Sequence, residues 1–160
     1  NLFNLDTHVL DLGSSPGGWS QYASSKIGNK GRIVACDILP MSPIIGVDFF
    51  QGDLRKKNTL NALLKYLENT KCHVVMSDMS PNITGHASID IPNSIYLCHL
   101  ALIFAKKILY KNGFFLFKSF QGEGFNEFYK EIKIFFSQVK ICKPKTSRTR
   151  SREIFILATK

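Results

Sequence analysis

Short apolar stretches alternate along the chain with segments whose apolar residues recur every three or four positions. The short stretches predict strands, and the periodic segments predict amphipathic helices, as at Leu60, Leu64 and Leu67. We expect strands over residues 8–12, 32–36, 47–51, 73–76, 114–117, 139–143 and 154–158. We expect helices over residues 19–27, 59–67, 93–110 and 125–136, and a loop over residues 79–92.

Strands that alternate with helices through short connections predict an α/β fold with a mostly parallel sheet and helices on both faces. The 160 residues suit a single domain, which we expect to span residues 1–160. Ligands of such sheets bind beyond the carboxyl ends of the strands. The residues at those ends are Asp11–Gly18, Asp37, Asp53, Asp78 and Lys118. We therefore expect one shared cleft at this edge of the sheet.

The turn after the first predicted strand, Gly13-Ser14-Ser15-Pro16-Gly17-Gly18, is rich in glycine and leads into a helix at Trp19. Its position is that of a nucleotide-binding turn. Ser15, however, replaces the middle glycine of a dinucleotide fingerprint, which lets the backbone approach a pyrophosphate. We therefore expect a nucleoside ligand without phosphates, and S-adenosylmethionine (SAM) is the commonest such ligand. The alternatives are a tight structural turn and, for Trp19, a core position.

Three acidic residues follow predicted strands. Asp37 lies about 20 residues past the glycine turn, the spacing of an acceptor for ribose hydroxyls, which both NAD and SAM carry. Asp53 is a candidate acceptor for the exocyclic amine of adenine. Asp78 lies where the reactive centre of a bound ligand is expected. The alternative for these acids is an exposed surface position at a strand end.

A lysine ends the otherwise apolar strand predicted over residues 114–117. Lys118 is either a lysine whose stem covers apolar surface or a functional amine held in a cleft, and we favour the second, because it would face Asp78 across adjacent strands. Glu153 begins the last predicted strand. For Glu153 the alternative is a solvated ion pair with Arg150 or Arg152.

The chain is strongly basic, with a net charge of +9 from 21 Lys and Arg against 12 Asp and Glu. This excess favours a polyanionic partner such as nucleic acid, and a soluble basic protein without such a partner is the alternative. Basic residues gather before Glu153, at Lys140, Lys143, Lys145, Arg148, Arg150 and Arg152. We expect Lys143, Lys145, Arg148, Arg150 and Arg152 to hold phosphates of such a partner.

The four cysteines lie far apart without a C-x-x-C pair, so we expect no metal site. Free thiols favour a reducing intracellular compartment, which is the cytoplasm, or a mitochondrion or other organelle if a targeting segment precedes Asn1. No apolar run in the sequence reaches the roughly 18 residues of a membrane span, so we expect no membrane partner.

Eight segments form longer motifs, in order along nearly the whole chain: residues 11–21 (DLGSSPGGWSQ), 37–41 (DILPM), 46–49 (GVDF), 51–53 (QGD), 75–82 (VMSDMSPN), 90–92 (DIP), 120–125 (FQGEGF) and 147–153 (SRTRSRE). Together they resemble the FtsJ/RrmJ (RlmE) family of ribosomal RNA 2′-O-methyltransferases. The resemblance implies a Rossmann-like SAM-dependent methyltransferase fold, with a seven-stranded sheet whose last strand is antiparallel.

The family uses a Lys-Asp-Lys-Glu tetrad, and the match implies that Asp78, Lys118 and Glu153 are catalytic. The first lysine of the tetrad belongs to a helix before the first strand. No lysine precedes Lys26 here, so we expect that member upstream of Asn1. The candidate cofactor contacts are Asp11, Gly13, Pro16, Gly17, Gly18, Trp19, Asp37, Ile38, Asp53, Leu54 and Asp78.

The implied reaction transfers the methyl group of SAM to the ribose 2′-hydroxyl of a uridine in large-subunit ribosomal RNA and leaves S-adenosylhomocysteine (SAH). Lys118 could stabilise the developing negative charge as an ammonium or take the proton as an amine, and nearby carboxylates favour the first role. We expect ribosomal RNA or a large ribosomal subunit particle as partner, without an obligate protein partner. The alternatives are a 2′-O-methyltransferase that acts on tRNA or an mRNA cap, and a non-catalytic SAM-binding module associated with the ribosome.

Overall fold

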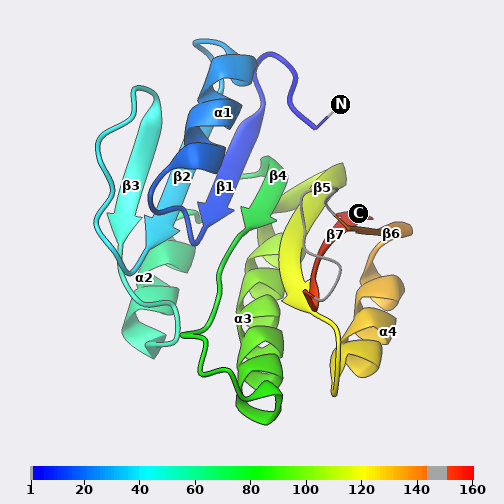
Figure 1. Cartoon of the computed structure of the whole chain (residues 1–160). Coiled ribbons are helices and arrows are strands. Elements are labelled where there is room, and N and C mark those ends of the chain that lie inside the picture. Colours follow the sequence, from blue (N-terminus) through cyan, green and yellow to red (C-terminus); the bar gives the residue numbers. More distant parts are fainter. Residues whose placement is uncertain (1, 144–150) are drawn as a thin grey trace.

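The computed structural model describes residues 2–143 and 151–160 (Figure 1). Its elements are β1 (His8–Leu12), α1 (Gly18–Ile27), β2 (Arg32–Asp37), β3 (Val47–Gln51), α2 (Lys57–Tyr66), β4 (Cys72–Ser77), α3 (Ala87–Ile108), β5 (Leu109–Phe120), α4 (Phe125–Phe135), β6 (Gln138–Cys142) and β7 (Glu153–Thr159). The strands form one seven-stranded sheet in the order β3-β2-β1-β4-β5-β7-β6. Only the pairings that β7 makes with β5 and β6 are antiparallel. The predicted sheet, with its antiparallel last strand, is confirmed.

The core is divided between the two faces of the sheet, because successive strand residues point to opposite sides. In β1, Val9 packs with Ala23 and Ile27 of α1. Leu10 and Leu12 belong to the larger cluster on the other face, which includes buried residues of α2, α3 and α4. Helices therefore cover both faces, as the alternation of elements predicts.

The start of α3 corrects the predicted loop over residues 79–92. The helix begins at Ala87 and contains Pro92, the last residue of the predicted loop. A proline inside a helix removes one backbone hydrogen bond. Here the first turn is anchored by Asp90, whose carboxylate accepts hydrogen bonds from the Thr84 N–H, the Thr84 hydroxyl and the Gly85 N–H. This anchoring ties the first turn of α3 to the loop that precedes it.

The end of α3 corrects a second boundary. The helix ends at Ile108 and β5 begins directly at Leu109, so the strand is much longer than the predicted residues 114–117. The Asn112-Gly113 pair, which lies between the predicted helix over residues 93–110 and the predicted strand, is inside β5. Asn112 adopts a φ of 65°, and the register against β4 shifts between Cys72 and Val74. The pair therefore marks an irregularity within a strand, a second common use of such residues.

By length and composition, α3 is also apolar enough to cross a membrane. In this fold its apolar residues pack against the sheet. Leu102, Phe104 and Ala105 are almost fully buried in the large core cluster. A core helix of an α/β domain accounts for this composition.

The carboxyl ends of β1 to β5 lie along one edge of the sheet, where the arrowheads of these strands end in Figure 1. The glycine turn follows β1, Asp37 is the last residue of β2, and Asp78 follows β4. Lys118 lies close to the end of β5. The predicted gathering of these residues at one edge is therefore confirmed.

Candidate active site

The glycine turn lies between the ends of β2 and β4. The N–H groups of Gly13 and Ser14 donate hydrogen bonds to the Cys36 carbonyl, at 2.8 and 3.2 Å. Gly13 has a φ of +78°, and a Cβ atom there would lie 2.7 Å from the backbone nitrogen of Met79. Gly17, at the start of α1, has a φ of +115°. Both positions require glycine, so the turn keeps its backbone close to the strand ends, as a nucleoside site needs.

Asp37 connects the glycine turn to the end of β2. One carboxylate oxygen, Oδ2, accepts a hydrogen bond from the Ser15 N–H at 2.9 Å, and the other, Oδ1, accepts one from the Leu39 N–H at 2.8 Å. Each carboxylate oxygen has a second lone pair. The side chain is therefore oriented by backbone groups and keeps acceptor capacity on both oxygens, which suits the two neighbouring hydroxyls of a ribose.

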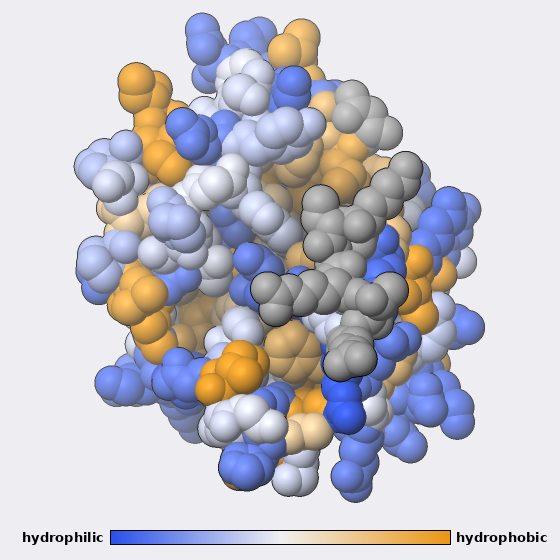
Figure 2. Space-filling model, viewed as in Figure 1, coloured by the Kyte–Doolittle hydropathy of each residue, from blue (hydrophilic) through white to orange (hydrophobic). Residues whose placement is uncertain are grey.

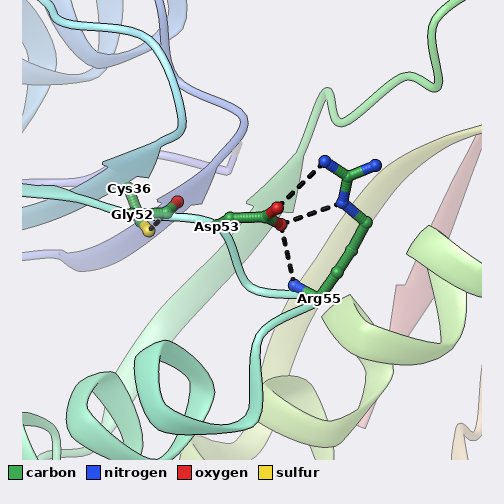
Figure 3. A network of polar contacts seen from close by, with 4 residues as sticks. All are labelled: Cys36, Gly52, Asp53 and Arg55. Carbon is green, nitrogen blue, oxygen red and sulfur yellow. Dashed lines mark hydrogen bonds and ion pairs between the residues drawn. The ribbon is translucent and has the colours of Figure 1, made fainter.

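Asp53 lies just after β3, and its carboxylate is bound by Arg55, as Figure 3 shows. The Arg55 guanidinium donates from Nε to Oδ1 and from Nη2 to Oδ2, both at 2.9 Å, and the Arg55 N–H donates to Oδ1 at 3.0 Å. The hydrogen bond from the Arg55 side chain is the main cause that lowers the pKa of Asp53 below its ordinary value. Arg55 carries no motif signal in the sequence, and only the turn geometry reveals its role.

Two predicted cofactor residues beside these acids differ in exposure. Ile38 follows β2 and is 45% exposed, as an apolar wall of a ligand site would be. Leu54 is only 5% exposed and belongs to the large core cluster, so a cofactor contact from this residue would have to come from its backbone. In the glycine turn, Pro16 and Gly18 are exposed.

Lys118 and Asp78 form an ion pair. The Lys118 Nζ lies 2.8 Å from the Asp78 Oδ1. The register pairs Ser77 of β4 with Phe117 of β5, so the next residues of the two strands are Asp78 and Lys118. The lysine side chain is 12% exposed and the aspartate side chain 37% exposed. The prediction that these side chains face each other across adjacent strands is confirmed, and the pair is open to solvent on the aspartate side.

Glu153 lies on the same sheet face as Lys118. In the antiparallel pairing of β5 with β7, Lys118 is opposite Phe155 and Phe120 is opposite Glu153. Residues two apart in a strand share a face, so Glu153 is the diagonal neighbour of Lys118, at a typical separation of about 7–8 Å between backbone positions. The half-buried Glu153 thus places a second carboxylate near the lysine.

Trp19, in α1, lies beside the sheet face that carries Lys118 and Glu153. It is partly buried, packs against the core cluster that includes Val9 and Met76, and its ring lies 5.7 Å from the ring of Phe155. Phe155 in turn is directly opposite Lys118. Trp19 therefore combines the core position that we gave as an alternative with a place beside the ion pair. Phe155 is a site neighbour that carries no sequence signal of its own.

Asp11 lies fully buried beneath the turn. Its Oδ2 accepts a hydrogen bond from the Ser20 hydroxyl at 2.6 Å, and its Oδ1 has no hydrogen-bond partner among the described residues. Burial is the main cause that raises the pKa of Asp11 from 3.8 to about 7, and the charges of Asp78 and Asp37 add to the rise. Because the side chain is enclosed, it offers a ligand no exposed surface, and the raised pKa keeps it protonated below about pH 7.

The structure describes only some of the basic residues that gather before Glu153. Lys145, Arg148 and Arg150 lie outside the described residues. Lys143 is exposed and donates a hydrogen bond from Nζ to the Ser151 carbonyl at 3.3 Å. Arg152 is exposed, and its carbonyl accepts a hydrogen bond from the Gln121 N–H, in the loop that follows β5. In the part of the chain that the structure describes, these two basic residues flank the end of β5 that carries Lys118.

The four cysteines are free thiols, of which Cys36, Cys72 and Cys98 are buried. Burial raises the pKa of each of these three thiols to about 12. Among residues 2–143 and 151–160, no group of three or more His, Cys, Asp or Glu side chains is arranged to hold a metal ion.

The family model described as FtsJ-like methyltransferase matches residues 1–160. This chain belongs to the FtsJ-like methyltransferase family. It is 65% identical over 159 residues to the ribosomal RNA large subunit methyltransferase E of Buchnera aphidicola subsp. Acyrthosiphon pisum, and the match covers 99% of this chain and 77% of that relative. The family resemblance of the sequence motifs is thereby confirmed.

Two solved structures show how this methyltransferase compares in three dimensions. A ribosomal RNA methyltransferase from Plasmodium falciparum is 26% identical with a TM-score of 0.84, and the match covers 98% of this chain and 87% of that one. Human methyltransferase-like protein 13, solved with SAH, is 15% identical with a TM-score of 0.71, and the match covers 95% and 71%. The second comparison shows the Rossmann-like methyltransferase fold.

SAM is the cofactor of this methyltransferase. The residues present fit that molecule. Asp37 offers acceptors to a ribose, the glycine turn brings its backbone close to the ligand position, and the Asp78 carboxylate supplies negative charge for a sulfonium. The missing middle glycine of the dinucleotide fingerprint had already made NAD the weaker candidate, and family membership confirms the choice of SAM.

Proposed function

We propose that this methyltransferase transfers a methyl group from SAM to the ribose 2′-hydroxyl of a uridine in large-subunit ribosomal RNA. The observation that carries the proposal is the Lys118–Asp78 ion pair of 2.8 Å, which lies at the same sheet edge as the cofactor turn. The identity of 65% with a ribosomal RNA large subunit methyltransferase E supports the choice of RNA.

The cofactor contacts are proposed from the geometry. When bound, SAM supplies an activated methyl group on a sulfonium. Asp37 accepts from the ribose hydroxyls, Asp53 accepts from the adenine amine, and the backbone of Gly17 lies beneath the ligand. Asp78 places negative charge on the side of the sulfonium, and the buried Asp11 holds the start of α1 beneath the ligand through its hydrogen bond with Ser20. These contacts orient the methyl group toward Lys118, which is how binding lowers the barrier of a displacement reaction.

Lys118 is the residue that acts on the ribose. A lysine ammonium has three N–H groups, and one of them points at Asp78 in the ion pair. A further N–H can donate to the 2′-oxygen and stabilise the negative charge that develops as the oxygen attacks. Asp78 fixes the direction of Nζ, and Glu153, on the same sheet face, is the proposed third catalytic residue. Because Nζ already acts as a donor, the geometry supports stabilisation over proton removal by the lysine.

The RNA is proposed to approach over the end of β5. Lys143 and Arg152 are exposed on that side, and the chain carries a net charge of +9. Figure 2 shows hydrophilic side chains spread over the visible face rather than confined to one patch, so the proposed approach of RNA rests on Lys143 and Arg152. Phosphate contacts of this kind position RNA without reading its sequence. Lys145, Arg148 and Arg150 are proposed as phosphate-binding residues from the sequence alone.

The proposed substrate also indicates the compartment in which the protein acts, which is the inside of the cell. Ribosomal subunits are assembled inside cells, which agrees with four unpaired cysteines and with the free thiols expected in a reducing compartment. We further propose that residues 1–160 act as a single domain, because one sheet carries both the cofactor turn and Lys118.

The proposal is tested with full-length protein, isotopically labelled SAM and separately prepared large ribosomal subunits, tRNA and capped mRNA. We expect label in large-subunit RNA, at a nucleotide whose following phosphodiester bond resists alkali, since alkaline cleavage needs a free 2′-hydroxyl. Label on a base, in tRNA or at a cap contradicts the proposed substrate. Binding of SAM without transfer to any of these RNAs supports a non-catalytic module instead.

A further inference from the structure

We propose that Arg55 sets the selectivity of this methyltransferase for a 6-aminopurine cofactor, by holding the Asp53 carboxylate so that one acceptor position remains for the base. Arg55 is then a positioning residue, because it acts on the cofactor through Asp53. The inference rests on the proposed function, in which Asp53 accepts a hydrogen bond from the adenine amine.

The contacts between the two side chains leave little rotational freedom. The Arg55 side chain folds back over the turn so that its guanidinium faces the carboxylate (Figure 3). Its Nε and Nη2 bind the two carboxylate oxygens at 2.9 Å each, in the bidentate geometry that arginine forms with carboxylates. The Arg55 N–H adds a bond of 3.0 Å to Oδ1. Three donors from a single residue thus fix the plane of the Asp53 carboxylate.

The count of acceptor sites determines what else can bind. A carboxylate offers about four lone-pair positions, two on each oxygen. Arg55 uses two on Oδ1 and one on Oδ2, so one position on Oδ2 stays available. One N–H of an exocyclic amine satisfies that position. A carbonyl at the same place on the base would bring its oxygen, a hydrogen-bond acceptor, against the Oδ2 of Asp53, which is also an acceptor.

The backbone of Asp53 is also held in place, which makes the direction of the remaining acceptor well defined. The Asp53 carbonyl accepts a hydrogen bond from the Lys56 N–H at 3.0 Å. On one side, the Gly52 N–H donates to the carbonyl of Asp37, the proposed ribose acceptor, at 2.8 Å. On the other side, Leu54 is buried in the core. The base acceptor and the ribose acceptor are therefore joined by a short, fixed stretch of backbone.

Arg55 acts on the orientation of the carboxylate rather than on its charge. An aspartate is ionised at neutral pH at its ordinary pKa, and the hydrogen bonds from Arg55 lower the pKa of Asp53 further, so the group acts purely as an acceptor. The Arg55 side chain is 53% exposed, whereas the Asp53 side chain is 16% exposed. Replacement of Arg55 therefore alters a surface side chain and leaves the core intact.

The chain contains a matched control. Arg32, at the start of β2, binds Asp48 of β3 through Nε and Nη2, each at 3.0 Å, and is 44% exposed. It is the same kind of surface ion pair, located at the opposite end of β2 from Asp37. The comparison of Arg55→Lys with Arg32→Lys therefore separates an effect on the cofactor from the general loss of an arginine–carboxylate pair. Lysine keeps the charge but cannot bind a carboxylate in the bidentate geometry.

The experiment measures, by calorimetry, the affinities of the full-length protein for SAH, for its 6-oxo analogue S-inosylhomocysteine, and for the analogue that lacks any group at position 6. We expect the unmodified protein and Arg32→Lys to prefer SAH over the 6-oxo analogue by about tenfold or more. We expect Arg55→Lys and Arg55→Met to lose most of that preference. Their affinity for the analogue without a 6-substituent should stay within about twofold of the unmodified protein.

The outcomes distinguish this inference from the proposed function. If both Arg55 variants keep the preference of the unmodified protein, the inference is wrong while the adenine contact of Asp53 stands. If the unmodified protein binds SAH and the 6-oxo analogue equally well, the adenine role of Asp53 fails, and the inference fails with it. If the Arg55 variants lose affinity equally for all three ligands, Arg55 supports the site as a whole and sets no selectivity. Thermal unfolding of each variant confirms that the compared proteins are folded.

Discussion

The ammonium of Lys118 lies 2.8 Å from the carboxylate of Asp78, across the carboxyl ends of two neighbouring parallel strands. The two residues come from strands separated in sequence by the whole of α3, so the sheet register is what brings them together. The pair is located beside the glycine turn, where we propose that the cofactor binds. This relationship connects the fold to methyl transfer, and the first prediction concerns it directly.

Lys118→Ala and Lys118→Arg should lower turnover at saturating SAM by about a hundredfold or more, because each removes an ammonium directed by Asp78 at the ribose oxygen. SAH affinity should stay within about threefold, since Lys118 acts on the acceptor RNA rather than on the nucleoside. Methyl transfer to large-subunit RNA and calorimetry measure the two effects. Lys133→Ala, an exposed lysine that lies 4.7 Å above the Tyr129 ring in α4, is the control. Near-normal turnover in both Lys118 variants would remove the residue from the mechanism.

Asp37→Asn should weaken SAH binding by roughly ten- to a hundredfold, because an amide cannot both hold the Ser15 and Leu39 N–H groups and accept from two ribose hydroxyls. Asp48→Asn, in the neighbouring strand β3, removes a carboxylate that binds Arg32 and should leave SAH affinity unchanged. Calorimetry with SAH measures both. An equal loss in the two variants would show that the effect comes from the sheet rather than from the ribose contact.

Asp11→Asn should change how stability depends on pH. The pKa of Asp11 is raised from 3.8 to about 7, so between these values the unfolded chain ionises this group while the folded protein keeps it protonated. The wild-type carboxyl therefore destabilises the fold increasingly as pH rises through this window, and fully above about 7. The amide variant avoids this loss, by an amount on the order of a few kcal/mol at pH 8, since one pKa unit corresponds to ~1.4 kcal/mol.

Urea unfolding of cofactor-free protein at several pH values tests this prediction. The stability of Asp11→Asn relative to the unmodified protein should rise from pH 4 to pH 7 and then level off. Glu68→Gln, an exposed carboxylate just after α2, should give a nearly flat difference over the same range. A flat difference for Asp11→Asn would mean that the buried carboxyl is ionised in the folded protein.

Asp90→Asn should loosen the loop that leads from Asp78 into α3. The Asp90 carboxylate accepts three hydrogen bonds from Thr84 and Gly85, and the bond from the Thr84 N–H is the main cause that lowers the pKa of Asp90. Hydrogen exchange of residues 79–86 should speed up by about tenfold, because an amide offers one acceptor atom in place of two. Glu127→Gln, which changes an acid in the first turn of α4, is the control. Unchanged exchange in this loop would contradict the anchoring role.

The sheet could be predicted from the sequence because its strands are short apolar stretches that end in polar residues. Phe114 to Phe117 followed by Lys118 is such a case, and Val74 to Met76 followed by Ser77 and Asp78 is another. Parallel strands end at one edge, so the pattern places Lys118 and Asp78 at the same edge, and the pairing of β4 with β5 makes them neighbours. The alternation of strands and helices also predicts the two-sided core.

The remaining features depend on contacts that a linear pattern does not carry. The start of α3 is tied by Asp90, whose carboxylate accepts hydrogen bonds from Thr84 and Gly85 in the preceding loop. The bidentate contact of Arg55 with Asp53 needs the turn that folds one side chain back on the other. The burial of Leu54 is set by how α2 packs on the sheet. Local propensity decides none of these.

The central claim is that the acceptor atom is a ribose 2′-oxygen directed by Lys118. The most direct test uses large-subunit RNA assembled from two synthetic forms, identical except that the nucleotide mapped as the methylation site carries a 2′-hydroxyl in one and a 2′-hydrogen in the other. With labelled SAM and full-length protein, we predict transfer to the first form and none to the second. Label that enters the 2′-deoxy form at the same nucleotide would contradict the account, because the methyl group would then have reached a different atom.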